Sequence, residues 1–113
     1  MKPGDIVLVR FPQADLQAGK LRPALVIAIA PDHHSDVLLA LITSRIYQAA
    51  SKLDEVLEKT DDDFSQSGLK VRSAIRLSRL ASVEPTVINA RLGEISAKRL
   101  AAMKKRLVEW LRR

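Results

Sequence analysis

Two apolar segments joined by a short polar turn, within residues 20–44, constrain the fold more than any other part of the sequence. The first runs from Pro23 to Ala30, and proline suits the first residue of a strand because no ladder donor is needed there. The second runs from Val37 to Ile42. The turn residues 31–36 lie between them, so the sequence predicts an antiparallel hairpin.

The open end of this hairpin places polar side chains together. Arg22 precedes the first apolar segment, and Thr43 and Ser44 follow the second. Because the turn joins the strands at one end of the ladder, the residues farthest from it meet at the other end. The hairpin therefore predicts a cation and a hydroxyl on one rim, which is a candidate functional site.

Other patterns predict further strands. Alternating apolar residues indicate strands within 1–12, 69–80 and 87–95. One side of the segment 69–80 carries Arg72 and Arg76 and is expected to face solvent. Short connections and the lack of a βαβ rhythm favour a closed antiparallel barrel or a sandwich.

The stretch from residue 45 to residue 64 has two interpretations. The first is a loop to about Lys52, a short strand near 54–58, and a turn or short helix through 61–66. The second is a helix, because apolar residues recur at helical spacing. These residues are Ile46, Ala49, Ala50, Leu53, Val56 and Leu57. Local pattern leaves both interpretations open.

The last segment predicts a helix capped by Ser96 and running to about Leu111. An apolar stripe along it is expected to pack on the strands. The stripe consists of Leu100, Met103, Leu107, Trp110 and Leu111. Most basic residues of the segment (98, 99 and 104–106) lie outside the stripe, which predicts a solvated basic face, with RNA contact as the alternative.

Charge is unevenly distributed along the chain. The 113 residues carry a net charge of +6, from 19 lysines and arginines against 13 acids. Residues 52–63 hold six acids and two lysines, a local charge of −4, so the remainder carries +10. This balance favours a polyanionic partner, nucleic acid ahead of membrane, although positive charge also keeps small domains soluble. The acidic run 61–63 is expected to be a solvated face rather than a cation site.

Several classes of protein are disfavoured. The chain has no cysteine, which excludes disulfides and thiolate metal sites. It has no apolar run of about 18 residues and no signal-like start, so we expect a soluble, cytoplasmic protein without a membrane partner. His33 and His34 share one turn and are not expected to converge on a metal, so no cofactor is predicted.

Five short blocks, in order and at consistent spacing, carry a family resemblance. They are GDIVLVRFP at 4–12, RPALVI at 22–27, LLALITS at 38–44, SAIRLSRLASVE at 73–84 and LGEIS at 92–96. With the helix after them, the chain resembles the MazF/PemK family of toxin endoribonucleases nearly end to end.

The resemblance implies a mainly β fold: a small SH3-like antiparallel β-barrel over 1–95 with a C-terminal α-helix over 96–112, in one domain that forms a homodimer. It favours the strand interpretation for 54–58. Proteins of this family cleave single-stranded mRNA at specific sequences without a metal ion, leaving a 2′,3′-cyclic phosphate and a 5′-hydroxyl. An antitoxin inhibits them by placing an extended acidic segment in the RNA site.

Carried over residue by residue, the family's essential arginine falls on Arg22 and its essential threonine on Thr43. Arg22 would clamp phosphate oxygens and Thr43 would orient the phosphate, while the general base stays unassigned. RNA-binding residues are expected in the polar loop and at the strand ends: Gln13, Asp15, Gln17, Gly19, Lys20, Ser44, Arg45 and Arg76.

Two positions depart from the family pattern, and two other functions compete. Arg10 stands where many relatives carry an acid or a small residue, and Ser78 where an acid or amide is common. The same barrel also serves as a gyrase poison that binds a protein target without chemistry. A catalytically inactive relative that binds RNA or a partner is the third possibility. The RP and ITS blocks favour the nuclease.

Overall fold

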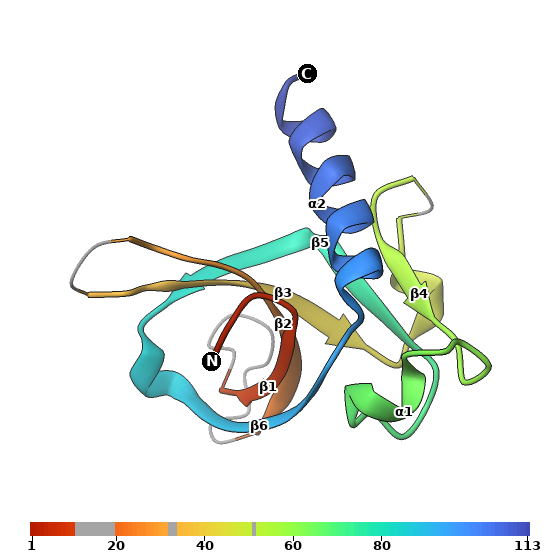
Figure 1. The fold of residues 1–113 in the computed structure, drawn as a ribbon, viewed down its shortest axis with the longest axis horizontal. Coiled ribbons are helices and arrows are strands. Elements are labelled where there is room, and N and C mark those ends of the chain that lie inside the picture. The colour runs from red at the N-terminus through yellow and green to blue at the C-terminus, as the bar shows by residue number, and fades with distance from the viewer. Residues whose placement is uncertain (11–19, 32–33, 51) are drawn as a thin grey trace.

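Antiparallel strands form most of the structure, a computed structural model that describes residues 1–10, 20–31, 34–50 and 52–113. Within these residues one sheet has six strands in the order β4-β5-β3-β2-β1-β6 (Figure 1). The strands are β1 (Asp5–Val9), β2 (Arg22–Ile29), β3 (Val37–Thr43), β4 (Glu55–Leu57), β5 (Ser73–Val83) and β6 (Ile88–Glu94). The helices are α1 (Phe64–Ser67), α2 (Ala97–Leu111) and the 3₁₀ turns η1 (Ile46–Gln48) and η2 (Pro85–Val87).

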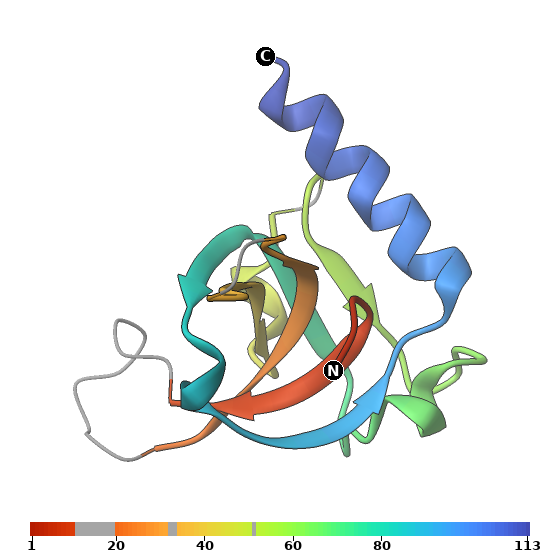
Figure 2. The ribbon, with the colours of Figure 1, turned by 60° about the vertical axis from the view of Figure 1, so that its left-hand side comes forward.

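The sheet curls until its two ends approach each other (Figures 1 and 2). Helix α1, which follows β4, packs against β6 at the opposite edge. Two glycines permit this contact, because a Cβ on Gly68 would collide with the carbonyl of Leu92, and one on Gly93 with the carbonyl of Gln66. Gly68 also has a φ of 75°, which glycine adopts without strain. The predicted mainly β, barrel-like class with a C-terminal helix is thus confirmed.

Apolar side chains form two cores on opposite faces of the sheet. Successive residues of a strand point to opposite faces, so Ile6 joins one core while Val7 joins the other. The first core includes Met103 and Leu107 of α2, whereas the second consists of strand residues. Burial on both faces explains why the first three strands are almost continuously apolar.

The predicted central hairpin is present. Strands β2 and β3 pair antiparallel, with Ala24 opposite Leu41 and Leu25 opposite Ala40. Arg22 and Thr43 each lie two residues beyond the first of these pairs, at the end away from the turn. The prediction that both residues share one rim is confirmed.

Residues 45–67 follow the loop-and-strand interpretation, and the helix interpretation is wrong. The segment contains η1, then β4, then α1. Strand β4 pairs with β5, placing Val56 opposite Ala74. Pairing of this kind joins residues distant in the sequence, so the helical spacing of the apolar residues did not reveal it.

Strand β5 departs from the predicted alternation. It begins at Ser73 rather than at residue 69, and Ala74, expected on the solvent-facing side, is fully buried. Its pairing with β3 shifts between the pairs Leu41–Arg76 and Ala40–Leu80, so three residues of β5 bulge there. The bulge resets the alternation, which explains why a strict period of two failed after Arg76.

Helix α2 begins where the sequence predicts. The Ser96 side chain accepts a hydrogen bond of 3.1 Å from the backbone N–H of Arg99, which caps the first turn. Met103 and Leu107 are buried, but Trp110 and Leu111 are 41% and 66% exposed, so the predicted stripe packs only along its first part. The helices of the described residues are all too short or too polar to span a membrane.

Arginines of α2 bind the acids near β4, which corrects two predictions. Arg99 donates hydrogen bonds to Glu55 at 2.8 Å and to Asp61 at 3.0 Å. It also binds both oxygens of Asp63, at 2.9 and 3.0 Å, and Arg106 binds Glu55. Asp63 is buried and Arg99 is largely so, whereas Asp62 is exposed. The acidic run is therefore only partly solvated, and Arg99 is not part of a solvated basic face.

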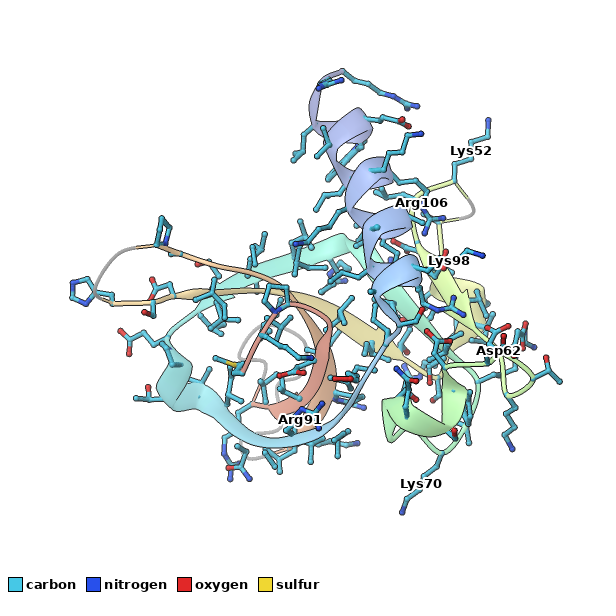
Figure 3. The ribbon with its side chains drawn as sticks, viewed as in Figure 1. Lys52, Asp62, Lys70, Arg91, Lys98 and Arg106 are labelled. Atoms are coloured by element: carbon cyan, nitrogen blue, oxygen red, sulfur yellow. The ribbon has the colours of Figure 1, made fainter. Side chains whose placement is uncertain are left out.

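This cluster, formed by Glu55, Asp61, Asp63, Arg99 and Arg106, is called the helix-docking cluster below. Figure 3 labels its member Arg106 on α2. Burial of Asp63 favours its protonated form. The hydrogen bonds from Arg99 and from the backbone N–H of Ser96 outweigh that effect and lower the pKa of Asp63 to about 2. The carboxylate is therefore held in its ionised form by the helix it anchors.

Candidate functional site

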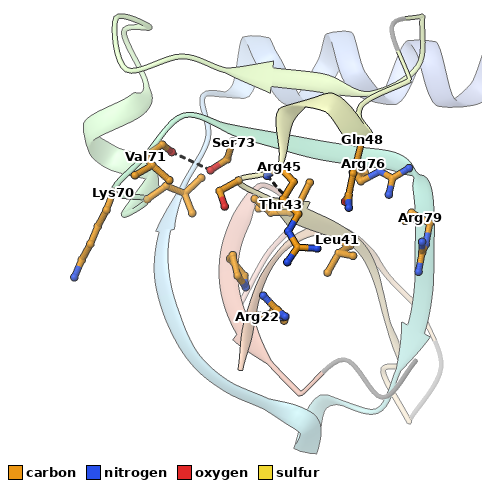
Figure 4. Close-up of a pocket in the computed structure, with 14 residues that line it drawn as sticks. Arg22, Leu41, Thr43, Arg45, Gln48, Lys70, Val71, Ser73, Arg76 and Arg79 are labelled. Atoms are coloured by element: carbon orange, nitrogen blue, oxygen red, sulfur yellow. Dashed lines mark hydrogen bonds between the residues drawn. The ribbon is translucent and has the colours of Figure 1, made fainter. Parts of the chain in front are cut away.

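A cavity of about 380 Å³ opens at the rim where β2 begins and β3 ends (Figure 4). It brings together five residues that the sequence assigns to the site, which are Arg22, Thr43, Ser44, Arg45 and Arg76. Further lining residues are Pro23, Leu41, Ile42, Gln48, Leu69, Lys70, Val71, Ser73 and Arg79. The hairpin thus supplies the centre of the cavity, and β5 with the segment before it supplies one wall.

The cavity wall is strongly basic. Its cations are Arg22, Arg45, Lys70, Arg76 and Arg79. Among the described residues that line it, none is an aspartate or glutamate. The apolar lining from Pro23, Leu41 and Val71 lowers the local dielectric and strengthens the field of these charges. Such a wall attracts an anion or a chain of anionic groups.

The Thr43 hydroxyl is held by the backbone that follows it. Its Oγ1 accepts a hydrogen bond of 3.1 Å from the backbone N–H of Arg45. A hydroxyl has one proton to donate and two lone pairs, so the Thr43 O–H still has its own proton to donate. The turn after β3 therefore fixes the side chain and leaves its proton available to a ligand oxygen.

Arg76 is anchored from behind the cavity by a carboxylate. Its Nε lies 3.4 Å from Oδ2 of Asp54, whose side chain is fully buried. Ser78 donates to the same carboxylate through its backbone N–H at 2.9 Å and through its hydroxyl. The departure at Ser78 therefore lies in a buried network next to the cavity.

Sequence reasoning missed some of the lining. A strict alternation along residues 69–80 places Arg79 on the face opposite Arg76, but the bulge in β5 brings both to the cavity. Gln48 lies in the stretch 45–64, whose two interpretations place its side chain differently. Lys70 lies just before β5, outside any strand. A basic residue close to a turn glycine was the one signal available for Lys70.

Other predicted residues do not join the cavity wall. Lys20 is exposed and is not among the lining residues. Gln13, Asp15, Gln17 and Gly19 lie outside the residues that the structure describes. Arg10 is exposed, and Arg72 is paired with Glu58 at 3.0 Å rather than directed into the cavity.

A second cavity, of about 510 Å³, lies beside the helix-docking cluster. Its lining mixes both signs of charge, with Glu55, Asp61, Asp62 and Asp63 facing Lys98 and Arg99. The described residues contain no group of three or more acidic or histidine side chains placed to hold a metal ion. Of the predicted histidine pair, His34 is exposed and His33 lies outside the described residues.

Comparison with known proteins agrees with this architecture. A solved structure described as an endoribonuclease in complex with its cognate antitoxin, from Mycobacterial species, superposes with a TM-score of 0.68. The match covers 98% of this chain and 94% of that one at 12% sequence identity, so it shows a shared fold. A comparison with curated protein sequences found no match.

A family model matches almost the whole chain. It describes the PemK-like, MazF-like toxins of type II toxin–antitoxin systems and matches residues 2–111. The match includes both strands of the central hairpin, the basic cavity and helix α2. The chain belongs to the PemK-like, MazF-like family of type II toxins.

Proposed function

We propose that this toxin is an endoribonuclease that cleaves single-stranded mRNA at the basic cavity without a metal ion. The observation that carries the proposal is the cavity wall itself, where Arg22 and Thr43 lie with four further cations and no lining acid among the described residues. Nucleic-acid backbones are bound through such cations and hydroxyls. The family membership and the fold shared with an endoribonuclease support it.

The proposed reaction uses the RNA's own 2′-hydroxyl as nucleophile. Its oxygen attacks the adjacent phosphorus while the bond from phosphorus to the 5′-oxygen breaks. The 2′-hydroxyl loses its proton, and the leaving 5′-oxygen gains one. The products are a 2′,3′-cyclic phosphate and a 5′-hydroxyl, with no water consumed. The step requires alignment of these atoms and stabilisation of charge on the phosphoryl oxygens.

Arg22 and Thr43 are assigned the catalytic roles. The guanidinium of Arg22 presents parallel N–H donors that match two phosphoryl oxygens, so it would stabilise the charge that grows in the transition state. The Thr43 hydroxyl, held by the backbone of Arg45, would donate to a phosphoryl oxygen and fix its orientation. Both groups act by position and charge rather than as bases.

The surrounding cations would bind neighbouring phosphates. Arg45 follows the hairpin, Arg76 and Arg79 come from β5, and Lys70 extends away from the other side chains in Figure 4. This arrangement suits an extended polyanion better than a single anion. Base recognition is assigned to the loop 13–20 and to Ser44.

The same cavity would bind the antitoxin. An extended acidic segment presents carboxylates to the lining arginines and would compete with RNA for them. We propose that the working form is a homodimer, because Val108, Trp110 and Leu111 at the end of α2 are large apolar side chains left exposed. Light scattering of the purified protein measures this assembly directly.

The test is cleavage of a long unstructured RNA in the presence of EDTA. Wild-type protein should cut at a short motif and leave cyclic-phosphate ends, whereas Arg22→Ala and Thr43→Ala should leave the RNA intact. Matched controls are Arg91→Ala, whose guanidinium pairs with Asp5 and Glu94 on the far side of β1, and Thr86→Ala in η2. Both controls should cleave as wild type does.

Intact RNA with folded wild-type protein would contradict the endoribonuclease proposal. Binding of an uncleavable RNA would then indicate an inactive relative. Binding of gyrase instead of RNA would indicate the gyrase-poison function.

A further inference from the structure

A buried carboxylate, that of Asp54, lies behind the cavity wall. The Asp54 side chain has no exposed surface and immediately precedes β4. It accepts hydrogen bonds from the backbone N–H of Ala50 at 2.9 Å and from the backbone N–H of Ser78 at 2.9 Å. The Ser78 hydroxyl lies 2.9 and 3.0 Å from its two oxygens. These contacts fix the carboxylate from two sides, by the loop before β4 and by β5.

Arg76 is the cation that balances this buried charge. A carboxylate without surface exposure is costly unless it is paired, and Arg76 is the side chain that forms its salt bridge. The bridge uses Nε, 3.4 Å from Oδ2. The four N–H bonds on the two terminal nitrogens of the guanidinium are not used by Asp54, so they can serve the cavity that Arg76 lines.

Asp54 can influence the cavity only indirectly. Asp54 is not a lining residue, so it does not touch a ligand in the cavity. Its effect on the site passes through Arg76, whose side chain is only 16% exposed and has little freedom to reorient. A guanidinium held through Nε presents its remaining donors in a fixed plane, which suits two oxygens of one phosphate.

We propose that Asp54 is a positioning residue for the RNA site, whose carboxylate holds the Arg76 guanidinium in the orientation that binds a phosphate flanking the scissile one. This role rests on the proposed endoribonuclease function. Asp54 acts on substrate affinity through Arg76 and takes no part in bond cleavage. It also accounts for Ser78, because a hydroxyl donates to Asp54, whereas an acid at this position would place a second carboxylate beside it.

A double-mutant cycle on RNA cleavage tests the role. Asp54→Asn keeps the shape of the side chain but replaces one carboxylate oxygen by an NH₂ group. That NH₂ group would face a backbone N–H donor, either of Ala50 or of Ser78. We expect KM to rise about tenfold with kcat unchanged, the loss typical of one charge-assisted hydrogen bond made equally in ground and transition states. In the Arg76→Ala background the same substitution should change KM less than about twofold, since the group it positions is absent.

Asp63→Asn is the matched control. Asp63 is also a buried acid that holds an arginine, but its partner Arg99 does not line the RNA cavity. Asp63→Asn should lower the melting temperature. It should leave KM unchanged when it is added to the wild-type protein and when it is added to Arg76→Ala. Ser78→Ala removes one donor from Asp54 and keeps the carboxylate, so it tests the role even where Asp54→Asn does not fold. KM should then rise in the presence of Arg76 and not in its absence.

Four results would overturn the role of Asp54. If Asp54→Asn raised KM by the same factor in the wild-type and the Arg76→Ala backgrounds, Asp54 would be a purely structural residue. The same conclusion would follow if Ser78→Ala raised KM by the same factor in both backgrounds. An unchanged KM in folded Asp54→Asn would show that Asp54 has no effect on RNA binding. Wild-type protein that leaves RNA intact would contradict the proposed function itself, and the role of Asp54 with it.

Discussion

The helix-docking cluster and the basic cavity both contain several arginines, but their surroundings differ. In the helix-docking cluster, Arg99 contacts three carboxylates and Arg106 contacts one of the same three. In the cavity, five cations line the wall, and the described lining residues include no acid. Asp54, which pairs with the cavity arginine Arg76, lies behind the wall.

This difference separates arginines that hold the fold from arginines that can bind a ligand. A guanidinium surrounded by carboxylates has its donors and its charge already used, and removing it leaves buried anions unpaired. A group of cations that outnumbers the acids near it keeps an outward field that a polyanion can neutralise, and the described residues that line the cavity include five cations and no acid. The residues outside 52–63 carry a net charge of +10, and we expect the cavity wall to contribute most of the positive field that a polyanion meets.

Replacing an arginine of the cavity should give the largest effect on activity. Arg22→Ala should lower kcat/KM for RNA cleavage by about 10²–10³-fold, as for loss of one preorganised donor to transition-state charge. The free energy of unfolding should change by less than about 1 kcal/mol. Cleavage kinetics and urea denaturation measure the two quantities. Equal effects on stability and activity would contradict the distinction between the two regions.

Replacing an arginine of the helix-docking cluster should give the opposite pattern. Arg99→Ala leaves the buried carboxylate of Asp63 without its cation and should destabilise the fold by about 3 kcal/mol. The folded fraction should cleave RNA at the wild-type rate. Lys98→Ala, an exposed neighbour on the same helix, is the control and should change neither quantity. A specific loss of cleavage in folded Arg99→Ala protein would link this cluster to the RNA site.

Acid should weaken the helix-docking cluster through Asp63. Its pKa of about 2 in the folded state lies below the usual value of 3.8, so the unfolded state binds the proton first. The stability it contributes, about 2 kcal/mol, is fully present above about pH 4 and is lost as the pH falls toward 2. Urea denaturation across this range should show a shallower acid dependence in Asp63→Asn. The exposed Asp62→Asn should retain the full dependence, and identical curves for both variants would refute the assignment.

Removing the helix cap should have the smallest effect. Ser96→Ala deletes the hydroxyl that accepts from the N–H of Arg99 and should cost about 1 kcal/mol. Ser82→Ala, at an exposed serine in β5, is the control. Cleavage by the folded protein should be unchanged in both. A loss of activity from Ser96→Ala would mean that α2 contributes to the site.

Much of the fold could be predicted because its signals are local. The hairpin of β2 and β3 follows from two apolar segments and a turn, and the start of α2 follows from Ser96. Local pattern alone could not decide the segment before β5, since its apolar spacing fits a helix while its structure depends on pairing of Val56 with Ala74. The family resemblance favoured the strand that is present. The exposed end of α2 could not be predicted either, because the spacing of apolar residues in a helix does not show where the sheet that it packs on ends.

The candidate site divides in the same way. Arg22 and Thr43 could be placed together from hairpin geometry alone. Arg79 could not, because the bulge in β5 is invisible in an alternating pattern. The helix-docking cluster was also hidden, since Arg99 and Glu55 are 44 residues apart in the chain and charge pairing at that distance leaves no local pattern.

One NMR titration tests the distinction between the two regions most directly. The Nε–H signals of the arginines would be followed while an uncleavable 2′-O-methyl RNA is added to the wild-type protein. The signals of Arg22, Arg45, Arg76 and Arg79 should shift, while those of Arg99 and Arg106 should stay in place. Shifts confined to Arg99 and Arg106, or no shift at any arginine at saturating RNA, would contradict the assignment of the cavity as the RNA site.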